Sequence, residues 1–175
     1  MRNMTWDPWA IKPDSEREVW DFSPLAAVGP LIFWMEHHEV EQAVGHRASL
    51  GRWGDRLSSA SFSQGFTVYY EDEHLHAVAI DACVGPQVRF EGAQLVGRPP
   101  SEVADWYGDN FERLQADYVI NQHGDPSSDR LGFVVRTQRA GDRLLTRPVF
   151  VGWQWSGRCG DIQESYIPEE EWQAR

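Results

Sequence analysis

The sequence predicts an α+β domain with two pseudo-repeats, each a short helix (or helix-loop-helix) followed by antiparallel strands, with the helices packed on one face of a sheet. Three observations support this fold class: an internal repeat, a helix signal in each half, and alternating apolar residues after each helix. Residues 39–45 align without gaps with residues 102–108, and residues 65–68 align with residues 132–135. Matching segments in the same order indicate that one unit was duplicated.

The repeat divides a single domain, residues 1–175, into two halves of about residues 22–90 and residues 91–158. A length of 175 residues suits one domain. Hydrophobic residues make up 41% of the chain and aromatic residues 13%, which is enough to fill the interior of such a domain. We therefore expect both halves to share one core.

The two ends of the chain differ from the repeated halves in composition. The N-terminal arm, residues 1–21, is rich in charged residues, proline and tryptophan, and we expect Trp6, Trp9 and Trp20 to hold it against the domain. The C-terminal tail, residues 159–175, is acidic, and we expect a loose segment or a short helix there.

The first helix is predicted just before residue 45. Val40, Ala43 and Val44 recur at helical spacing and form a small apolar face. Gly45 follows, and glycine readily adopts the positive φ angle that ends a helix. The first half therefore opens with a short amphipathic helix.

The second helix is predicted from residue 99 onward. A proline pair at residues 99–100 suits a helix start, because proline lacks only a donor that would be unpaired there. Glu102 lies near the positive end of the helix dipole. Val103, Trp106 and Tyr107 supply the buried face. Gly108 either ends this helix or precedes a second short turn.

A β-hairpin is predicted after the first helix. Phe66, Val68 and Tyr70 alternate with less apolar residues, as in a half-buried strand. An acidic turn at residues 71–73 follows, and the run of residues 74–80 returns as a second strand. A short strand at residues 88–90 then leads into the second half.

A longer hairpin is predicted in the second half, with strands at residues 131–137 and residues 144–155 and a turn at residues 140–142. By the two-residue period of a strand, four of its apolar residues share one face: Val149, Val151, Trp153 and Trp155. A helix followed by a meander, twice, predicts a sheet with helices on one side. The other face of that sheet is expected to be free for docking.

The charge balance indicates which partners suit the chain. It contains 27 acidic and 16 basic Lys and Arg residues, for a formal net charge of −11. Such a surface repels phosphate, so we expect neither nucleic acid nor a membrane as partner, and a basic protein fits better. The N-terminus lacks a signal-peptide pattern and no run approaches membrane-spanning length, which predicts a cytoplasmic protein. Cys83 and Cys159 are expected to be free thiols in that compartment, although they could pair.

Catalytic motifs are absent from the sequence. It contains no Gly-x-Ser-x-Gly elbow, no phosphate-binding glycine loop and no zinc-ligand spacing. His74 and His76 lie two apart on a predicted strand and offer a weak alternative as metal ligands. The simpler interpretation is a pair of partly exposed residues beside the acidic turn. We therefore predict no catalytic residue, no cofactor and no metal.

Tryptophan is unusually frequent, with nine residues, and it is enriched at the energetic centres of protein interfaces. We predict that six residues bind a partner: Trp53, Glu71, Asp72, Glu73, Trp153 and Trp155. The acidic three would attract a basic partner and speed its association. The alternative is that the tryptophans pack beneath a helix and that the acidic triplet is only a solvated turn.

Two segments carry a resemblance to known proteins. Residues 28–31, Met35, Glu39–Val40 and Gly45 look like the start of small actinobacterial α+β proteins, and residues 90–99 are similar to their second-half opening. The tandem arrangement resembles the beta-lactamase inhibitor protein fold, and the size and acidity resemble bacterial toxin-immunity proteins. The resemblance implies binding to a partner on a sheet face. It transfers no catalytic residue, and the chain lacks that inhibitor's signal peptide and two disulfides.

Two hypotheses of function follow, from different classes. The first is a non-catalytic protein-binding module, an immunity-type inhibitor that neutralises a cognate bacterial toxin with a basic domain. The alternative is a small-ligand-binding protein or small enzyme with an aromatic pocket between the halves and acid–base groups at His74, His76 or His123. A purely structural subunit is a third possibility. The sequence does not determine the oligomeric state.

Overall fold

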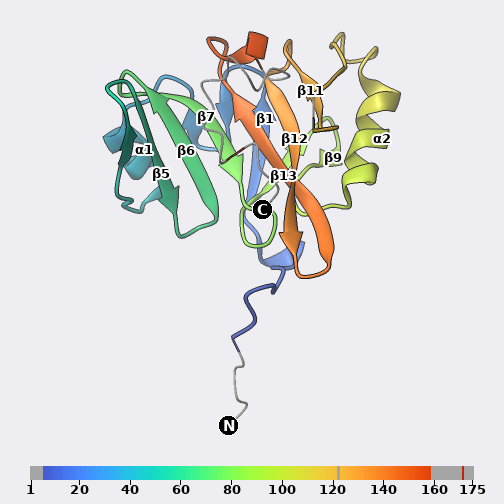
Figure 1. Cartoon of the computed structure of the whole chain (residues 1–175), viewed down its shortest axis with the longest axis horizontal. Coiled ribbons are helices and arrows are strands. Elements are labelled where there is room, and N and C mark those ends of the chain that lie inside the picture. Colours follow the sequence, from blue (N-terminus) through green and yellow to red (C-terminus); the bar gives the residue numbers. More distant parts are fainter. Residues whose placement is uncertain (1–5, 122, 159–170, 172–175) are drawn as a thin grey trace.

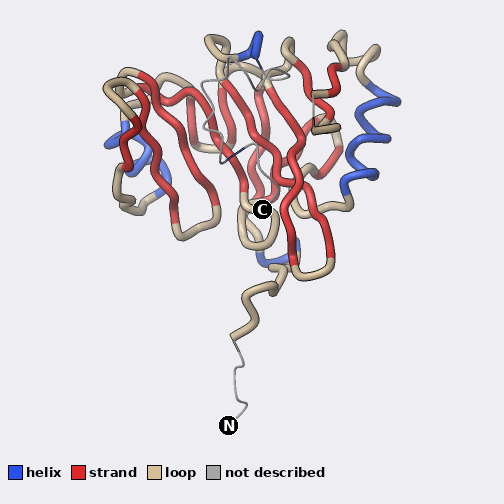
Figure 2. Tube along the Cα trace, viewed as in Figure 1, coloured by secondary structure: helices blue, strands red, loops and turns tan. Residues whose placement is uncertain are grey.

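The computed structural model describes residues 6–121, 123–158 and 171. Two β-sheets are stacked on each other, and the two helices lie at opposite sides of the molecule (Figure 1). Most strand pairs are antiparallel. The chain is thus a mixed α+β protein, as the sequence predicts. The first described residues extend away from both sheets (Figure 2).

The described residues form seventeen elements in chain order. Between residues 14 and 80 these are η1 (Asp14–Glu16), β1 (Val19–Ser23), β2 (Ala27–Val28), β3 (Leu31–Ile32), α1 (His37–Val44), β4 (Gly51–Trp53), β5 (Leu57–Phe62), β6 (Phe66–Glu71) and β7 (His74–Ile80). Between residues 87 and 158 these are β8 (Gln87–Phe90), β9 (Ala93–Gln94), α2 (Pro100–Asn110), β10 (Val119–Ile120), β11 (Pro126–Ser128), β12 (Phe133–Ala140), β13 (Arg143–Val151) and η2 (Ser156–Arg158).

The strands form one large and one small sheet. The large sheet has eight strands in the order β10-β11-β12-β13-β7-β6-β5-β4, and the small sheet has five in the order β3-β2-β1-β8-β9. At the centre of the large sheet β13 pairs antiparallel with β7, and at the centre of the small sheet β1 pairs parallel with β8. The sequence did not predict the small sheet, because most of its strands are too short to show an alternating pattern.

Both predicted helices form: α1 ends at the predicted residue and α2 begins at the predicted proline pair. The Glu36 backbone N–H donates to the Glu39 carboxylate at 2.8 Å, one half of a reciprocal capping box that opens α1. Gly45 ends α1 with a φ angle of 72°. Pro100 occupies the first turn of α2. The prediction for Ala43 is wrong, because this side chain is exposed and only Val40 of α1 is fully buried.

The second helix continues through Gly108 and ends at Asn110. Its buried residues are Val103 and Tyr107, and Trp106 is partly buried. The Asn110 side-chain amide donates to the Trp106 carbonyl at 2.7 Å, which stabilises the last turn. Of the two alternatives for Gly108, an end of the helix at this residue is therefore wrong.

The hairpin of β6 and β7 forms as predicted. Its two turn residues, Asp72 and Glu73, have φ angles of 48° and 67°. Two positive φ angles match the turn geometry that suits the twist of paired strands. The hairpin of β12 and β13 also forms, with Ala140 opposite Arg143 across its turn.

The strand β13 ends earlier than predicted, at Val151. Gly152 follows, and its N–H donates to the His76 carbonyl at 2.8 Å. A Cβ atom at residue 152 would lie only 2.9 Å from Cγ of Phe33, so a larger residue would not fit there. The chain then turns, so Trp153 is 66% exposed whereas Trp155 is 2% exposed. The prediction that these two tryptophans share one strand face is therefore wrong.

The main core lies between the two sheets. Phe22 of the small sheet packs against Phe90, Phe133 and Phe150, with ring centroids 4.6 to 6.2 Å apart. Val40 of α1 and Val103 of α2 belong to the same hydrophobic cluster. Aromatic pairs of this kind stabilise a core beyond the area that they bury.

The opposite face of the large sheet is also buried at its centre. A second hydrophobic cluster lies there, formed by Tyr69, Ala77, Ala79, Val134, Val149, Val151 and Trp155. Two buried arginines, Arg136 and Arg147, adjoin it. The prediction of a sheet face left free for docking is therefore wrong at the centre of the sheet. Arginines on these strands are typical of a solvent-exposed face, so the sequence did not indicate that this face is buried.

Of the three tryptophans that were predicted to hold the N-terminal arm, only Trp20 is buried in the core, so the prediction is wrong for Trp6 and Trp9. Trp6 and Trp9 are exposed, and Trp20 lies buried within β1, which begins inside the predicted arm. Among the residues described, no helix is both long and apolar enough to cross a membrane. The predicted C-terminal tail, Cys159 included, lies outside the described residues except for Glu171.

Candidate functional site

An irregularity in β7 shapes the candidate site. Tyr69 pairs with Ala77 and Tyr70 with Leu75, so His76 is an extra residue on its strand, a β-bulge. The His76 ring stacks on Trp155, with centroids 5.1 Å apart, and meets the edge of Trp34 at 5.7 Å. Bulges commonly re-aim side chains beside functional sites. Here the bulge places a buried histidine between two tryptophans.

Trp34 is the most constrained residue of this site. Its φ angle of 84° is one that side-chain-bearing residues rarely adopt, at a cost of about 1–3 kcal/mol. The Trp34 N–H donates to the Leu75 carbonyl at 2.8 Å, and the indole stacks on His74 with centroids 4.2 Å apart. Half of the residue is still exposed. Trp34 is thus an exposed aromatic side chain held in one position.

The acidic turn is largely neutralised by two arginines. Arg56 donates to both carboxylate oxygens of Asp72, at 3.0 and 2.7 Å, and lies 3.3 Å from the Glu71 carboxylate. Arg52 pairs with Glu73 at 2.7 Å. These hydrogen bonds lower the pKa of Asp72 and the pKa of Glu73. The triplet therefore attracts a basic partner less strongly than its sequence suggests.

An open cavity of about 270 Å³ lies between these groups. Its lining residues are Trp34, Arg56, Glu71, Asp72, His76 and Gln154. The Trp155 indole N–H donates to the Glu71 carboxylate at 2.9 Å, which fixes both beside the cavity. Aromatic walls with a few charged groups suit the side chain of a partner more than a reacting centre.

The histidines of the site are engaged in packing. Burial lowers the pKa of His76, although the nearby Glu71 charge opposes this shift. His76 is therefore neutral near pH 7. His74 Nδ1 lies 2.7 Å from the Asp72 carbonyl oxygen and so donates to it. Within the described part of the chain, no group of three or more His, Cys, Asp or Glu residues could hold a metal ion.

The structure brings together only part of the predicted site. Four predicted residues line or adjoin the cavity: Glu71, Asp72, His76 and Trp155. Trp53 instead stacks on Tyr69 with centroids 6.2 Å apart, and Trp153 points to solvent. His123 is an exposed residue next to the β10–β11 turn. Three strands separate β10 from β7 in the large sheet, so His123 lies apart from the two β7 histidines.

Sequence reasoning missed three residues of the cavity: Trp34, Arg56 and Gln154. Trp34 follows the apolar β3 segment and reads as an ordinary core residue. Its positive φ angle depends on the hydrogen bond to β7, which no local pattern reveals. Arg56 precedes β5, and the β4–β5 hairpin was not predicted. A signal was available for Arg56, since an exposed arginine sixteen residues before an acidic turn suits a cross-strand pair.

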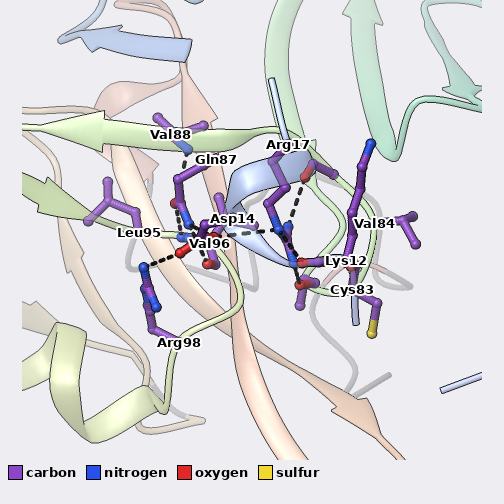
Figure 3. Close-up of polar contacts among 12 residues, drawn as sticks. Lys12, Asp14, Arg17, Cys83, Val84, Gln87, Val88, Leu95, Val96 and Arg98 are labelled. Atoms are coloured by element: carbon purple, nitrogen blue, oxygen red, sulfur yellow. Dashed lines mark hydrogen bonds and ion pairs between the residues drawn. The ribbon is translucent and has the colours of Figure 1, made fainter. Parts of the chain in front are cut away.

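A second polar cluster fixes the N-terminal arm (Figure 3). The buried Arg17 guanidinium donates to the carbonyls of Gly85, Ala82 and Cys83, at 2.8 to 3.0 Å. Asp14 accepts hydrogen bonds from Arg98 at 2.5 Å and from Gln87 at 2.9 Å. Arg17 thereby ties the arm to the loop between β7 and β8, and Asp14 ties it to Gln87 of β8. We assign it a structural role.

Cys83 lies beside this cluster as a buried free thiol. Burial raises the pKa of Cys83, and the nearby Asp81 charge adds to the shift. A raised pKa leaves little of the reactive thiolate near pH 7.

No family model, no curated protein and no solved structure matches this chain. The resemblance to the beta-lactamase inhibitor protein fold and to toxin-immunity proteins therefore stays a prediction.

Proposed function

We propose that this chain is a non-catalytic protein-binding module that docks its partner on the face around Trp34. The observation that carries the proposal is the state of Trp34 itself: half exposed, strained in its backbone and fixed by stacking on His74. A rigid, exposed tryptophan loses little conformational freedom on binding, which favours affinity. Tryptophan is also enriched among residues that dominate interface energies.

A second exposed tryptophan supports the same face. Trp153 follows Gly152, which packs against the ring of Phe33, the residue before Trp34. The two exposed indoles therefore belong to neighbouring segments of the fold. A cavity for one partner side chain lies beside Trp34. Aromatic anchors next to a small cavity are typical of a protein interface.

The charge around Trp34 favours a basic partner. Its carboxylates outnumber its guanidiniums: Glu36, Glu71, Asp72 and Glu73 against Arg52 and Arg56. The whole chain carries −11. We propose a cytoplasmic immunity-type inhibitor whose partner is a bacterial toxin with a basic domain, because size, acidity and the lack of catalytic motifs suit that role.

The pseudo-repeat belongs to the same proposal. Residues 19–80 and residues 87–151 each contain two or three short strands, a helix and a four-stranded meander in that order, and Val40 and Val103 join one core. This repeated order supports duplication of one unit. Duplication would give a large sheet whose two halves meet at β7 and β13, beside the proposed docking face.

The alternative function is a small-ligand-binding protein, and one observation favours it. A hollow of about 460 Å³ lies where the halves meet in the small sheet, lined by residues 21–24 and residues 89–92. Its charged groups are already paired, because Arg89 lies 3.3 Å from Asp21. Phe22 and Phe90 are buried in the core, so the hollow is not the aromatic pocket that the sequence suggested. The docking function is better supported.

The experiment is to mix the purified chain with the products of the genes that flank its own gene and to measure binding by titration calorimetry. We expect one complex, and Trp34→Ala should weaken it by about 2 kcal/mol or more, roughly thirtyfold. Trp9→Ala is the matched control, because Trp9 is similarly exposed but lies on the N-terminal arm. Equal losses for both variants, or no complex with any flanking product, would contradict the proposal.

A further inference from the structure

Two arginines face each other on a buried part of the large sheet. Arg136 of β12 and Arg147 of β13 are directly opposite in the register of the hairpin. Neither is more than 4% exposed. Like charges at directly opposite positions repel each other, and burial strengthens the repulsion. Such a pair persists only where anionic groups compensate it.

One of these groups is the carboxylate of Glu171, which is 1% exposed. Arg147 binds it with two nitrogens: Nε donates to Oε1 at 2.6 Å and Nη2 donates to Oε2 at 3.1 Å. The Tyr69 hydroxyl donates to Oε2 at 2.5 Å. Paired Arg–carboxylate contacts of this kind are strong and geometrically specific.

The backbone of Glu171 is recognised as well. Arg136 Nε donates to the Glu171 carbonyl oxygen at 2.6 Å, while Arg136 Nη1 donates to Asp125 at 2.7 Å. The two arginines therefore bind both the side-chain carboxylate and the main-chain carbonyl of the same residue. This double contact fixes how a glutamate in a peptide segment must lie.

The donors and the acceptor come from different parts of the chain. Tyr69 lies on β6, Arg136 on β12 and Arg147 on β13, which are three strands of the large sheet. Glu171 comes from beyond the last strand and is 102 residues from Tyr69 in sequence. Burial alone would lower the pKa of Arg147, but the charge and the hydrogen bond of Glu171, together with Tyr69 and Asp81, raise this pKa. The sheet thus supplies the donors of this site, and Glu171 supplies the acceptors.

We propose that Tyr69, Arg136 and Arg147 form a recognition site for a glutamate-bearing peptide segment, filled by Glu171 in the free protein and by an acidic segment of another protein once Glu171 is displaced. The partner is identified by its chemistry, a glutamate with an accessible main-chain carbonyl. This proposal is independent of docking through Trp34, because none of its residues lines the cavity beside that indole.

The test uses the full-length chain with Glu171→Ala and a synthetic peptide of residues 163–175. With the resident carboxylate removed, the peptide should bind and raise the melting temperature of the variant. A peptide in which the same glutamate is replaced by glutamine should bind at least about tenfold more weakly. Measurements near 0.15 M salt limit long-range repulsion between two acidic molecules to about 8 Å.

A second measurement avoids a variant that fails to fold. The wild-type chain, labelled with ¹⁵N at arginine, is titrated with each peptide and the Arg147 Nε–H resonance is followed. The glutamate peptide should shift this resonance in a saturable manner, and the glutamine peptide should not. The wild-type chain should need a higher peptide concentration than the Glu171→Ala variant, because its own Glu171 competes for the site. Equal effects of the two peptides, or no effect of either on both proteins, would overturn the proposal.

Discussion

On strands β12 and β13, the side chains that point toward the small sheet differ in chemistry from those that point away. The inward positions hold Phe133, Val135 and Phe150, which pack against the small sheet. The outward positions alternate valine with charge, as in Val134 and Arg136. Both faces are buried at the centre of the sheet. Burial by itself therefore does not decide which residues a strand position accepts.

This difference shows which face of the sheet stabilises the fold and which face selects the segments that pack on it. Apolar packing on the inward face depends on shape and volume, and it tolerates no cavity. On the outward face, each buried guanidinium needs a carboxylate partner, because a buried charge without one destabilises the fold. One face supplies most of the stability. The other face fixes which segments can lie on it, which is why we place a recognition site there.

The largest expected effect is on the inward face. Phe150→Ala removes a fully buried ring that packs 4.6 Å from the Phe22 centroid, and it should lower the free energy of unfolding by about 3–5 kcal/mol. Urea unfolding followed by tryptophan fluorescence measures the change. Leu144→Ala, on the same strand but about half exposed, should change stability by less than about 1 kcal/mol. Similar losses would remove the contrast between packed and exposed positions.

The next effect tests charge balance on the outward face. Asp125→Asn leaves Arg136 buried without this carboxylate partner, at a cost of about 3 kcal/mol. Replacing both residues, as Asp125→Leu with Arg136→Met, should cost less than the single change, because no uncompensated charge remains. The same urea experiment compares the variants. A double variant less stable than Asp125→Asn would show that the ion pair itself stabilises the fold.

The inward face could largely be predicted from the sequence. Alternation at Phe66, Val68 and Tyr70 predicted the β6–β7 hairpin, and the proline pair and Gly45 predicted helix boundaries. These signals are local, since each depends on neighbours a few residues away. They indicate elements and their apolar faces, and the structure confirms these elements.

The outward face and the candidate site could not be predicted in the same way. Arg136 and Arg147 look like solvated residues until their register partner and Glu171 are known. The burial of Trp155 and the exposure of Trp153 follow from a turn after Gly152, which packs against Phe33, more than a hundred residues away in the sequence. The strained Trp34 depends on pairing with β7. Each of these features is a long-range contact without a local pattern.

The smallest expected effect is a pH dependence at His76, on the outward side of β7. Burial lowers the pKa of His76 below the ordinary value of 6.5 that it has in the unfolded chain. The unfolded chain therefore binds more protons in this range, so stability must fall as the pH falls below about 6.5 and must go on falling until it reaches the lowered pKa. The charged groups near this ring are Glu71 and Asp72, which favour its protonation, and His74, which opposes it.

The measurement compares melting temperatures at about pH 7.5 and about pH 5.5, the interval in which an ordinary histidine titrates. The wild-type chain should lose more stability on acidification than His76→Gln, and His38→Gln should behave like the wild type because its side chain is largely exposed. The loss should be smaller than that caused by Asp125→Asn, since a histidine can shed its proton whereas Arg136 keeps its charge. An identical acid response in the wild type and His76→Gln would mean that His76 titrates as freely in the folded chain as in the unfolded one, and the outward face would then tolerate charge at this position as well.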